Sequence, residues 1–247
     1  MSRVRRYRFL IPSVTPSGGW QTILVFSPLL LGLLALIAIP WIGKLSKGTK
    51  SDGSSARRIV AIAPNSAEVI CALGACDRIV GVSKFCVYPP ELLNLPKVGG
   101  LSDPDLERIA ALRPDLLVMR GKNDALERLC EELRVPIYKD ETDTLPGILN
   151  CVGELGTRLD LNEQAKTIIE EFHDRLDAIR SRNVGKHPPR VLLTVSRQPD
   201  RLANVLTTGK GTFLDQMIEI AGGVNVFGHL DMIYPQVSPE GMLAQHP

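Results

Sequence analysis

Histidine and cysteine are scarce in this sequence, and their scarcity excludes several kinds of site. The four histidines are scattered, so spacing assembles neither a catalytic triad nor a histidine-rich metal site. The five cysteines contain no CxxC pair, and Cys71 and Cys76 fit neither a zinc knuckle nor a redox pair. We therefore interpret the cysteines as buried structural residues and predict no metal site. Their odd number leaves at least one thiol free, or paired between chains, if the domain is extracytoplasmic.

The sequence also lacks an excess of either charge. The net charge of the 247 residues is +2, and basic residues are mixed with acidic ones without an aromatic and basic patch, which excludes nucleic acid as a partner. Residues 209–212 (GKGT) lack the residue order of a phosphate-binding loop. We predict that the protein is not an enzyme and that it uses no cofactor.

A long uncharged stretch lies near the start of the chain. Residues 23–42 could cross a bilayer core of roughly 30 Å. Trp20 and Trp41 mark the ends of this stretch, and preceding arginines favour a cytoplasmic basic N-terminus at residues 1–22. A cleaved signal peptide is the competing interpretation, but no convincing cleavage site or lipobox cysteine follows. We expect a transmembrane anchor or uncleaved signal at 23–42, and a flexible tether at 43–56.

Strand and helix patterns alternate after the tether. Short β-branched runs and helical segments follow one another through residues 57–160, which predicts an α/β lobe with a mostly parallel sheet and helices on both faces. In such sheets ligands bind at the carboxyl ends of the strands. At these ends Asn65 or Ser66 is expected to cap a helix, while Phe85 and Tyr88 lie in an ordered loop.

Residues 161–182 carry the longest amphipathic pattern of the chain. About 20 helical residues span roughly 30 Å, the diameter of a small domain, so we predict an interlobe helix at residues 161–185. The alternative is a long surface helix of a single domain. A strand pattern at 190–195 and a helix pattern at 212–221 then restart the alternation, which predicts a partial second α/β lobe at residues 186–247, again with a mostly parallel sheet flanked by helices.

The end of the chain repeats a motif of the first lobe. Glu107 stands seven residues before Pro114, and Glu240 stands seven residues before Pro247. Each glutamate opens a short helix after a cluster of serine and proline, which indicates an internal repeat. Asp115 and a strand follow the first copy, whereas this sequence stops after the second copy. We therefore expect that the second lobe is truncated.

Several motifs, in order, give this sequence a family resemblance. The segments are RIVAIAPNSAEVICALG, YPPELLNLPKVGG, DLERIAALRPDLLVMRG, GTFLDQMIEIAGGVNVF and YPQVSPEGMLA. From about Arg57 onward the chain resembles the helical-backbone class of ABC-transporter solute-binding proteins, nearest its cobalamin-binding branch. That class captures cobalamin, iron–siderophore complexes and haem. The resemblance implies two α/β lobes joined by one long helix, a ligand between them, and delivery to an ABC permease with its ATPase.

The resemblance also implies roles for particular residues. Glu107 and Glu240 would dock onto arginines of the permease. The ligand-binding positions that the resemblance implies are Tyr88, Arg120 and Tyr234. Asn65 and Phe85 are predicted as ligand-binding residues because each follows the end of a strand. Leu101 stands where the cobalamin branch tends to carry an aromatic residue, so iron–siderophore and haem stay open as ligands.

We therefore predict a solute-binding protein tethered to the cell inner membrane by its N-terminal span. Its domain would face the periplasm or extracytoplasmic space and bind cobalamin or another metal chelate. A membrane-anchored ligand sensor without a transport role is the alternative from another class.

Overall fold

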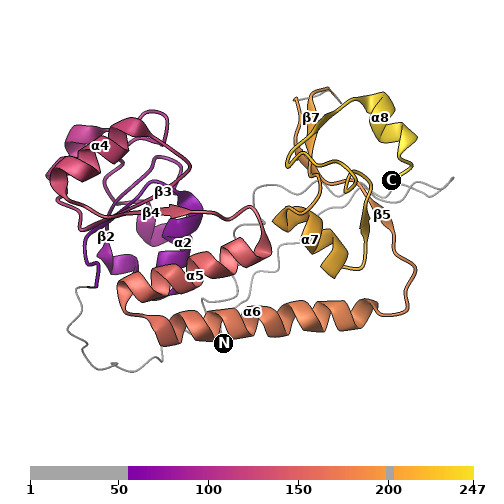
Figure 1. Cartoon of the computed structure of the whole chain (residues 1–247), viewed down its shortest axis with the longest axis horizontal. Coiled ribbons are helices and arrows are strands. Elements are labelled where there is room, and N and C mark those ends of the chain that lie inside the picture. Colours follow the sequence, from indigo (N-terminus) through magenta and orange to yellow (C-terminus); the bar gives the residue numbers. More distant parts are fainter. Residues whose placement is uncertain (1–54, 199–202) are drawn as a thin grey trace, which may run out of the picture.

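The computed structural model describes residues 55–198 and 203–247, which form two lobes at the two ends of one long helix, α6 (Asn162–Asn183) (Figure 1). This arrangement confirms the predicted α/β fold with two lobes and a backbone helix. The predictions for residues 1–22 and 23–42, and for most of the tether, lie outside the described residues. None of the helices in the described ranges combines the length and apolar character of a membrane span.

The first lobe is built on a parallel sheet with the strand order β2-β1-β3-β4. Its strands are β1 (Ile59–Ala61), β2 (Ile79–Val82), β3 (Leu116–Arg120) and β4 (Ile137–Asp140). They read as almost continuous apolar runs because helices cover both faces of the sheet. Along β1, Ile59 packs into one core cluster and Val60 into the other, as the two-residue period of a strand requires.

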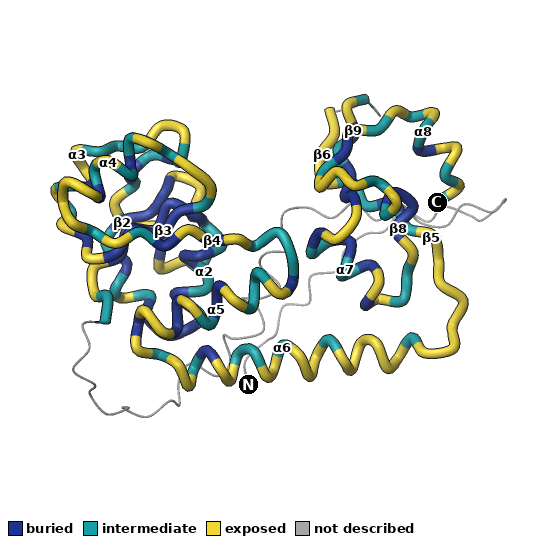
Figure 2. Tube along the Cα trace, viewed as in Figure 1, coloured by how far each residue is buried: buried dark blue, intermediate teal, exposed yellow. Residues whose placement is uncertain are grey.

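Two pairs of helices cover the sheet, so its strands are the most buried part of the lobe (Figure 2). On one face lie α2 (Pro64–Ala72) and α5 (Leu145–Leu159). On the other face lie α3 (Leu106–Ala111) and α4 (Asp124–Leu133). Two 3₁₀ turns complete the lobe, Cys76–Arg78 and Pro90–Leu92.

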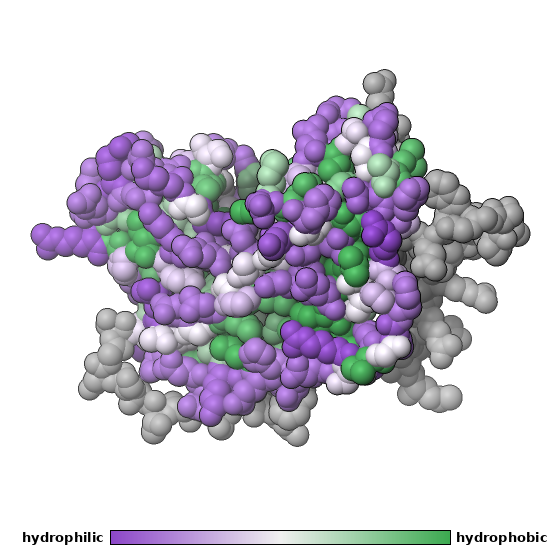
Figure 3. Space-filling model, turned by 45° about the vertical axis from the view of Figure 1, so that its right-hand side comes forward, coloured by the Kyte–Doolittle hydropathy of each residue, from purple (hydrophilic) through white to green (hydrophobic). Residues whose placement is uncertain are grey.

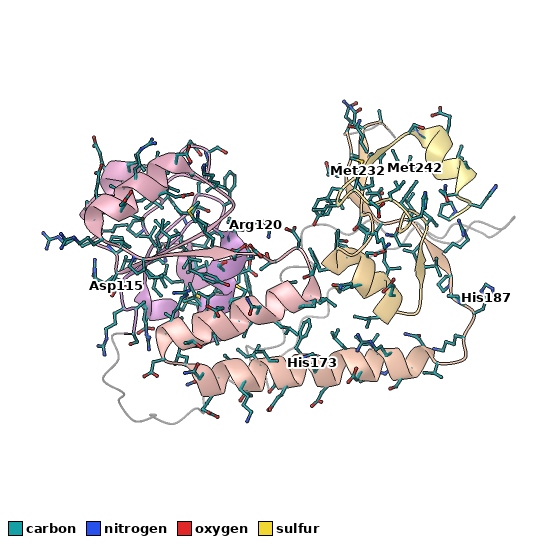
Figure 4. All side chains as sticks on the ribbon, viewed as in Figure 1. Asp115, Arg120, His173, His187, Met232 and Met242 are labelled. Carbon is teal, nitrogen blue, oxygen red and sulfur yellow. A yellow bond between two sulfur atoms is a disulfide. The ribbon has the colours of Figure 1, made fainter. Side chains whose placement is uncertain are left out.

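The carboxyl ends of the strands face the second lobe. Figure 4 shows this for β3, with Asp115 beside the start of the strand at the far edge of the lobe and Arg120 at the near edge. The side chains that follow these strands are therefore presented to the space between the lobes.

The first half of α6 packs against α5. Gly156 permits the close approach, since a Cβ at this position would lie 2.5 Å from the Cβ of Ala165. Further along α6 the apolar side is less covered: Leu176 is half-buried and the exposed fraction of Ile179 is 39%. This half of the helix spans the distance to the second lobe.

The second lobe differs from the sequence prediction in its sheets. Its strands are β5 (Arg190–Val191), β6 (Thr194–Ser196), β7 (Val205–Thr207), β8 (Val224–Asn225) and β9 (Gln236–Val237). Only β5 and β8 pair in parallel, whereas β6, β7 and β9 form an antiparallel sheet, so a mostly parallel sheet was wrong for this lobe. The strand predicted at 190–195 is split, because the chain changes sheets at Leu193, whose carbonyl accepts a 2.7 Å hydrogen bond from the Thr207 hydroxyl.

The helices of the second lobe are α7 (Phe213–Ile220) and α8 (Pro239–Ala244), and α8 repeats α3 of the first lobe. The guanidinium of Arg58 donates hydrogen bonds of 2.6–3.2 Å to the carbonyls of the two residues before Pro114. Arg190 donates hydrogen bonds of 2.6–3.2 Å to the carbonyls of the two residues before Pro247. The residue directly before each proline has a positive φ, 46° and 44°. The internal repeat is therefore structural.

Cys71 and Cys76, which the sequence indicated only as buried structural residues, form a disulfide. The chain turns back after α2 at Gly74, whose φ of +90° favours glycine, and this turn brings the two Cα atoms to 4.1 Å. Spacing along the sequence could not show this approach. The remaining cysteines are free and buried: Cys86, Cys130 and Cys151.

Candidate ligand-binding site

A cavity of about 320 Å³ lies between the lobes, with walls from both lobes and from α6. Most of its surface is apolar, and hydrophobic side chains are visible between the two ends of the molecule in Figure 3. The main apolar side chains of the walls are Val69, Ile148, Val152, Ile168, Phe172 and Phe213. Such a concave apolar site with a few polar groups is typical of small-molecule binding.

Arg120 supplies the main positive charge at the polar end of the cavity. One of its terminal nitrogens lies 2.5 Å from a carboxylate oxygen of Asp143, and the other donates to the Thr142 hydroxyl. A third acceptor, the carboxylate of Asp140, lies 3.7 Å away. These partners fix the guanidinium at the end of β3, where 41% of the side chain remains exposed.

A buried carboxylate supports this polar end from behind. The side chain of Asp140 is fully buried, and it accepts hydrogen bonds from the Ser66 hydroxyl and, at 3.3 Å, from the Asn65 amide. Burial raises the pKa of Asp140, while the hydrogen bond from Ser66 and the charge of Arg120 oppose the rise. Asp140 follows the strand-end rule that selected Arg120, so the sequence did hold a signal for it.

The expectation that Asn65 or Ser66 caps a helix was wrong. Helix α2 begins one residue earlier, at Pro64, and Ala63 occupies the N-cap without a side-chain hydrogen bond. Proline suits the first helical position, because its fixed φ matches a helix and the N–H that it lacks would have no acceptor within the helix. Asn65 and Ser66 therefore lie in the first turn, and Asn65 lines the cavity.

Tyr234 brings an aromatic ring from the second lobe to the same cavity. Burial and the nearby Asp143 carboxylate raise the pKa of the Tyr234 hydroxyl, and Arg120 opposes the rise. Asn65, Arg120 and Tyr234 are thus the three predicted ligand-binding residues that the structure brings together.

Phe85 and Tyr88 do not line this cavity. The side chain of Phe85 is 61% exposed, and its ring lies where a Cβ on Gly100 would be 2.9 Å away. Tyr88 is half-buried, and its hydroxyl has no hydrogen-bond partner among the described residues. The contact of these two rings with a ligand stays a prediction.

Sequence reasoning missed the helical walls of the cavity. Glu68 follows Asn65 by three residues on α2, and burial raises the pKa of its carboxyl to about 7. Phe172 reaches the cavity from α6, beside Glu171 and Arg175, which lie 3.9 Å apart. Helical spacing does align these residues, but it does not tell which face of α6 meets a ligand.

Glu107 and Glu240 lie apart from the cavity. Each is exposed in the first turn of a six-residue helix, α3 in one lobe and α8 in the other. Figure 2 shows both helices on the side of the molecule opposite α6. No group of three or more histidine, cysteine, aspartate or glutamate side chains in the described ranges could hold a metal ion.

Comparison with known proteins extends these observations. The chain is 29% identical over 194 residues to a vitamin B12-binding protein of Vibrio cholerae, covering 78% of this chain and 68% of that protein. The crystal structure of the periplasmic vitamin B12 binding protein BtuF of Vibrio cholerae superposes with a TM-score of 0.65, covering 78% of this chain and 74% of that chain at 29% identity.

A haem-binding protein is similar in structure as well. The apo form of the periplasmic heme-binding protein RhuT from Roseiflexus sp. RS-1 gives a TM-score of 0.65 at 26% identity, covering 79% of this chain and 74% of that chain. The family model described as periplasmic binding protein matches residues 59–247, which include both lobes and α6. The chain therefore belongs to the periplasmic binding protein family, whose members bind solutes outside the cytoplasm.

Proposed function

We propose that this protein captures cobalamin, or a related metal chelate, in the cavity between its lobes and delivers it to an ABC permease. The observation that carries the proposal is the cavity itself, which takes walls from both lobes and from α6. A ligand held there contacts both lobes and the helix that joins them. Aromatic rings such as Tyr234 suit a large flat ligand, because they bury much area at little cost in rotamer entropy.

The charges of the cavity support an uncharged ligand over an anionic one. Its ionisable side chains are the carboxylates of Glu68, Asp143 and Glu171 and the guanidiniums of Arg120 and Arg175. Arg120 lies 2.5 Å from Asp143 and Arg175 lies 3.9 Å from Glu171, so each cation already has a carboxylate beside it before a ligand binds. Cyanocobalamin, which is uncharged overall, asks for no such cation. Haem or a ferric siderophore is the second candidate, supported by the structural likeness to a haem-binding protein.

Location and delivery form the second part of the proposal. The disulfide between Cys71 and Cys76 suits an oxidising compartment outside the cytoplasm. The uncharged residues 23–42 would tether the protein to the inner membrane. Glu107 and Glu240, exposed one on each lobe, would dock onto arginines of the permease.

Ligand titration tests the proposal. We would titrate the full chain, purified in mild detergent, with cyanocobalamin, hemin and a ferric siderophore, and follow intrinsic fluorescence and ligand absorbance. We expect cyanocobalamin to bind most tightly and Tyr234→Ala to weaken its binding by about tenfold, as the loss of a buried aromatic contact would. Met232→Ala, at an exposed side chain of the same lobe, is the control.

Tighter binding of hemin would select the second candidate, and binding of none of the three ligands would overturn the proposal. Ligand binding without association with any permease would favour the sensor alternative.

A further inference from the structure

Two helix N-termini, one from each lobe, meet at the edge of the cavity. The N–H of Phe213, the first residue of α7, donates a 2.7 Å hydrogen bond to the carbonyl of Asp143. The N–H of Leu145, the first residue of α5, donates a 2.8 Å hydrogen bond to the side-chain oxygen of Gln216. Each lobe thus satisfies the first donor of a helix in the other lobe.

Nothing within either helix could satisfy these two donors. The first N–H groups of a helix have no intrahelical acceptor, so side chains or other segments must supply one. The N-cap side chains, Thr144 for α5 and Thr212 for α7, accept from N–H groups further along, those of Gly147 and Asp215. The first donors are left for the opposite lobe. Separation of the lobes would expose both of them.

The same segment is connected to the ligand site through Asp143. Its backbone carbonyl accepts from Phe213 in the second lobe, while its carboxylate lies 2.5 Å from Arg120 in the first. Arg120 is held from the other side by Thr142 and Asp140. The Arg120–Asp143 ion pair therefore fixes the segment that carries the interlobe hydrogen bond.

We propose that Asp143, Leu145, Phe213 and Gln216 form an interlobe latch that sets how far the cavity closes, with Asp143 and Gln216 as its positioning residues. The latch joins the lobes on the cavity side, opposite the covalent connection through α6. It keeps Tyr234 and Phe213 of the second lobe against Arg120 of the first. Retention of a ligand in the cavity, which rests on the proposed function, would depend on this latch.

The ligand-free protein tests the latch directly. Spin labels at Arg128→Cys and Ala221→Cys, exposed positions in the two lobes, report the interlobe distance in the full chain in detergent. We expect Gln216→Leu, which removes the acceptor, to broaden the distance distribution, and Asp143→Asn, which removes the ion pair, to do the same. Gln216→Glu keeps an acceptor and should preserve the parental distribution. Gln164→Leu, at a half-buried glutamine of α6 whose side chain makes no hydrogen bond among the described residues, is the control. If Gln216→Leu and the parental chain gave the same distribution, the latch would be refuted.

Ligand kinetics separate the latch from the proposed function. With cyanocobalamin as the probe, we expect Gln216→Leu to raise the dissociation rate about three- to tenfold, the effect of losing one hydrogen bond, with a smaller change in association rate. Gln216→Glu should restore slow dissociation. An unchanged dissociation rate in a variant with a broadened distance distribution would refute the role in retention. If the parental chain did not bind cyanocobalamin, the proposed ligand would fail while the distance measurement still decided the latch.

Discussion

Glu68 is the cavity residue whose charge changes nearest neutral pH. Burial raises the pKa of its carboxyl to about 7, from 4.5. The folded state therefore binds more protons than the unfolded state between pH 4.5 and 7, and the free energy of unfolding falls as the pH rises through this window. Above pH 7 the charged carboxylate destabilises the fold by its full contribution.

Replacement of this carboxyl by an amide should remove the dependence. The stability of Glu68→Gln minus that of the parental chain should be about 1 to 2 kcal/mol larger at pH 8 than at pH 4.5. This is less than the pKa shift alone would give, because water screens a half-buried group. Urea unfolding of both chains at the two pH values measures the difference. Glu131→Gln, at an exposed residue of α4, is the control and should show no such change. An equal stability difference at both pH values would contradict the burial of Glu68.

At the same scale, the sequence predicted part of the candidate site. Asn65, Arg120 and Tyr234 were predicted because each lies next to the end of a strand or within a motif that this sequence shares with the family. All three line the cavity. Glu68 and Phe172 were not found, because their exposure to the cavity depends on how α2 and α6 sit against the second lobe. The packing of one lobe against the other produces no periodic residue pattern, so the sequence alone does not reveal it.

At the scale of elements, regular patterns were predicted and irregular ones were not. The parallel strands of the first lobe lie in apolar, β-branched runs and α6 carries a helical pattern over 22 residues, and both predictions were confirmed. Strands β6, β7 and β9 are as short as β1, but β6 and β9 are largely exposed and show no apolar run, so the antiparallel sheet was missed. The disulfide of Cys71 and Cys76 was missed because the turn at Gly74, not the spacing, brings the cysteines together.

The repeated arginine anchor gives a prediction for α3. Arg58 donates to the carbonyls of Leu112, the C-cap of α3, and of Arg113, which follows it, and the six residues of α3 are too few to be stable alone. We expect Arg58→Ala to lower the free energy of unfolding by about 1 to 2 kcal/mol, the net contribution of hydrogen bonds from a charged donor.

The neighbouring arginine provides a matched control for this anchor. The side chain of Arg57 makes no hydrogen bond within the described ranges, so Arg57→Ala should change stability by less than about 0.5 kcal/mol. Urea unfolding of the two variants gives the comparison. Equal losses in both would show that Arg58 acts through its charge or bulk, without anchoring α3.

At the scale of the whole molecule, the two lobes differ in the size of their cores. In the first lobe two large clusters of buried apolar residues lie on the two faces of the sheet. The described core of the second lobe is one small cluster of Leu192, Val205, Val226, Phe227 and Met242. Fewer buried contacts lower the free energy of local opening.

We expect amide hydrogen exchange to be faster in residues 190–198 and 203–247 than in residues 57–138. Equal protection in the two lobes would contradict this.

The arrangement of both lobes on one helix gives the prediction for docking. Glu107 on α3 and Glu240 on α8 are exposed, and these two helices lie on the side opposite α6, one on each lobe. A permease with two arginines could therefore engage both glutamates only at the interlobe spacing that the fold maintains. A rim-exposed ion pair contributes about 0–1 kcal/mol, whereas a pair desolvated in an interface costs roughly 2–5 kcal/mol when one partner is removed.

We expect the double variant Glu107→Ala, Glu240→Ala to bind its permease in nanodiscs about 10- to 100-fold more weakly, with a reduced dependence on salt, and to bind ligand as the parental chain does. The matched control is Glu131→Ala with Glu219→Ala, which removes one exposed glutamate from each lobe without touching α3 or α8. It should dock normally, because net charge alone acts weakly over a screened distance. If the double variant at 107 and 240 docked normally but lost ligand, these glutamates would belong to the ligand site and another surface would meet the permease.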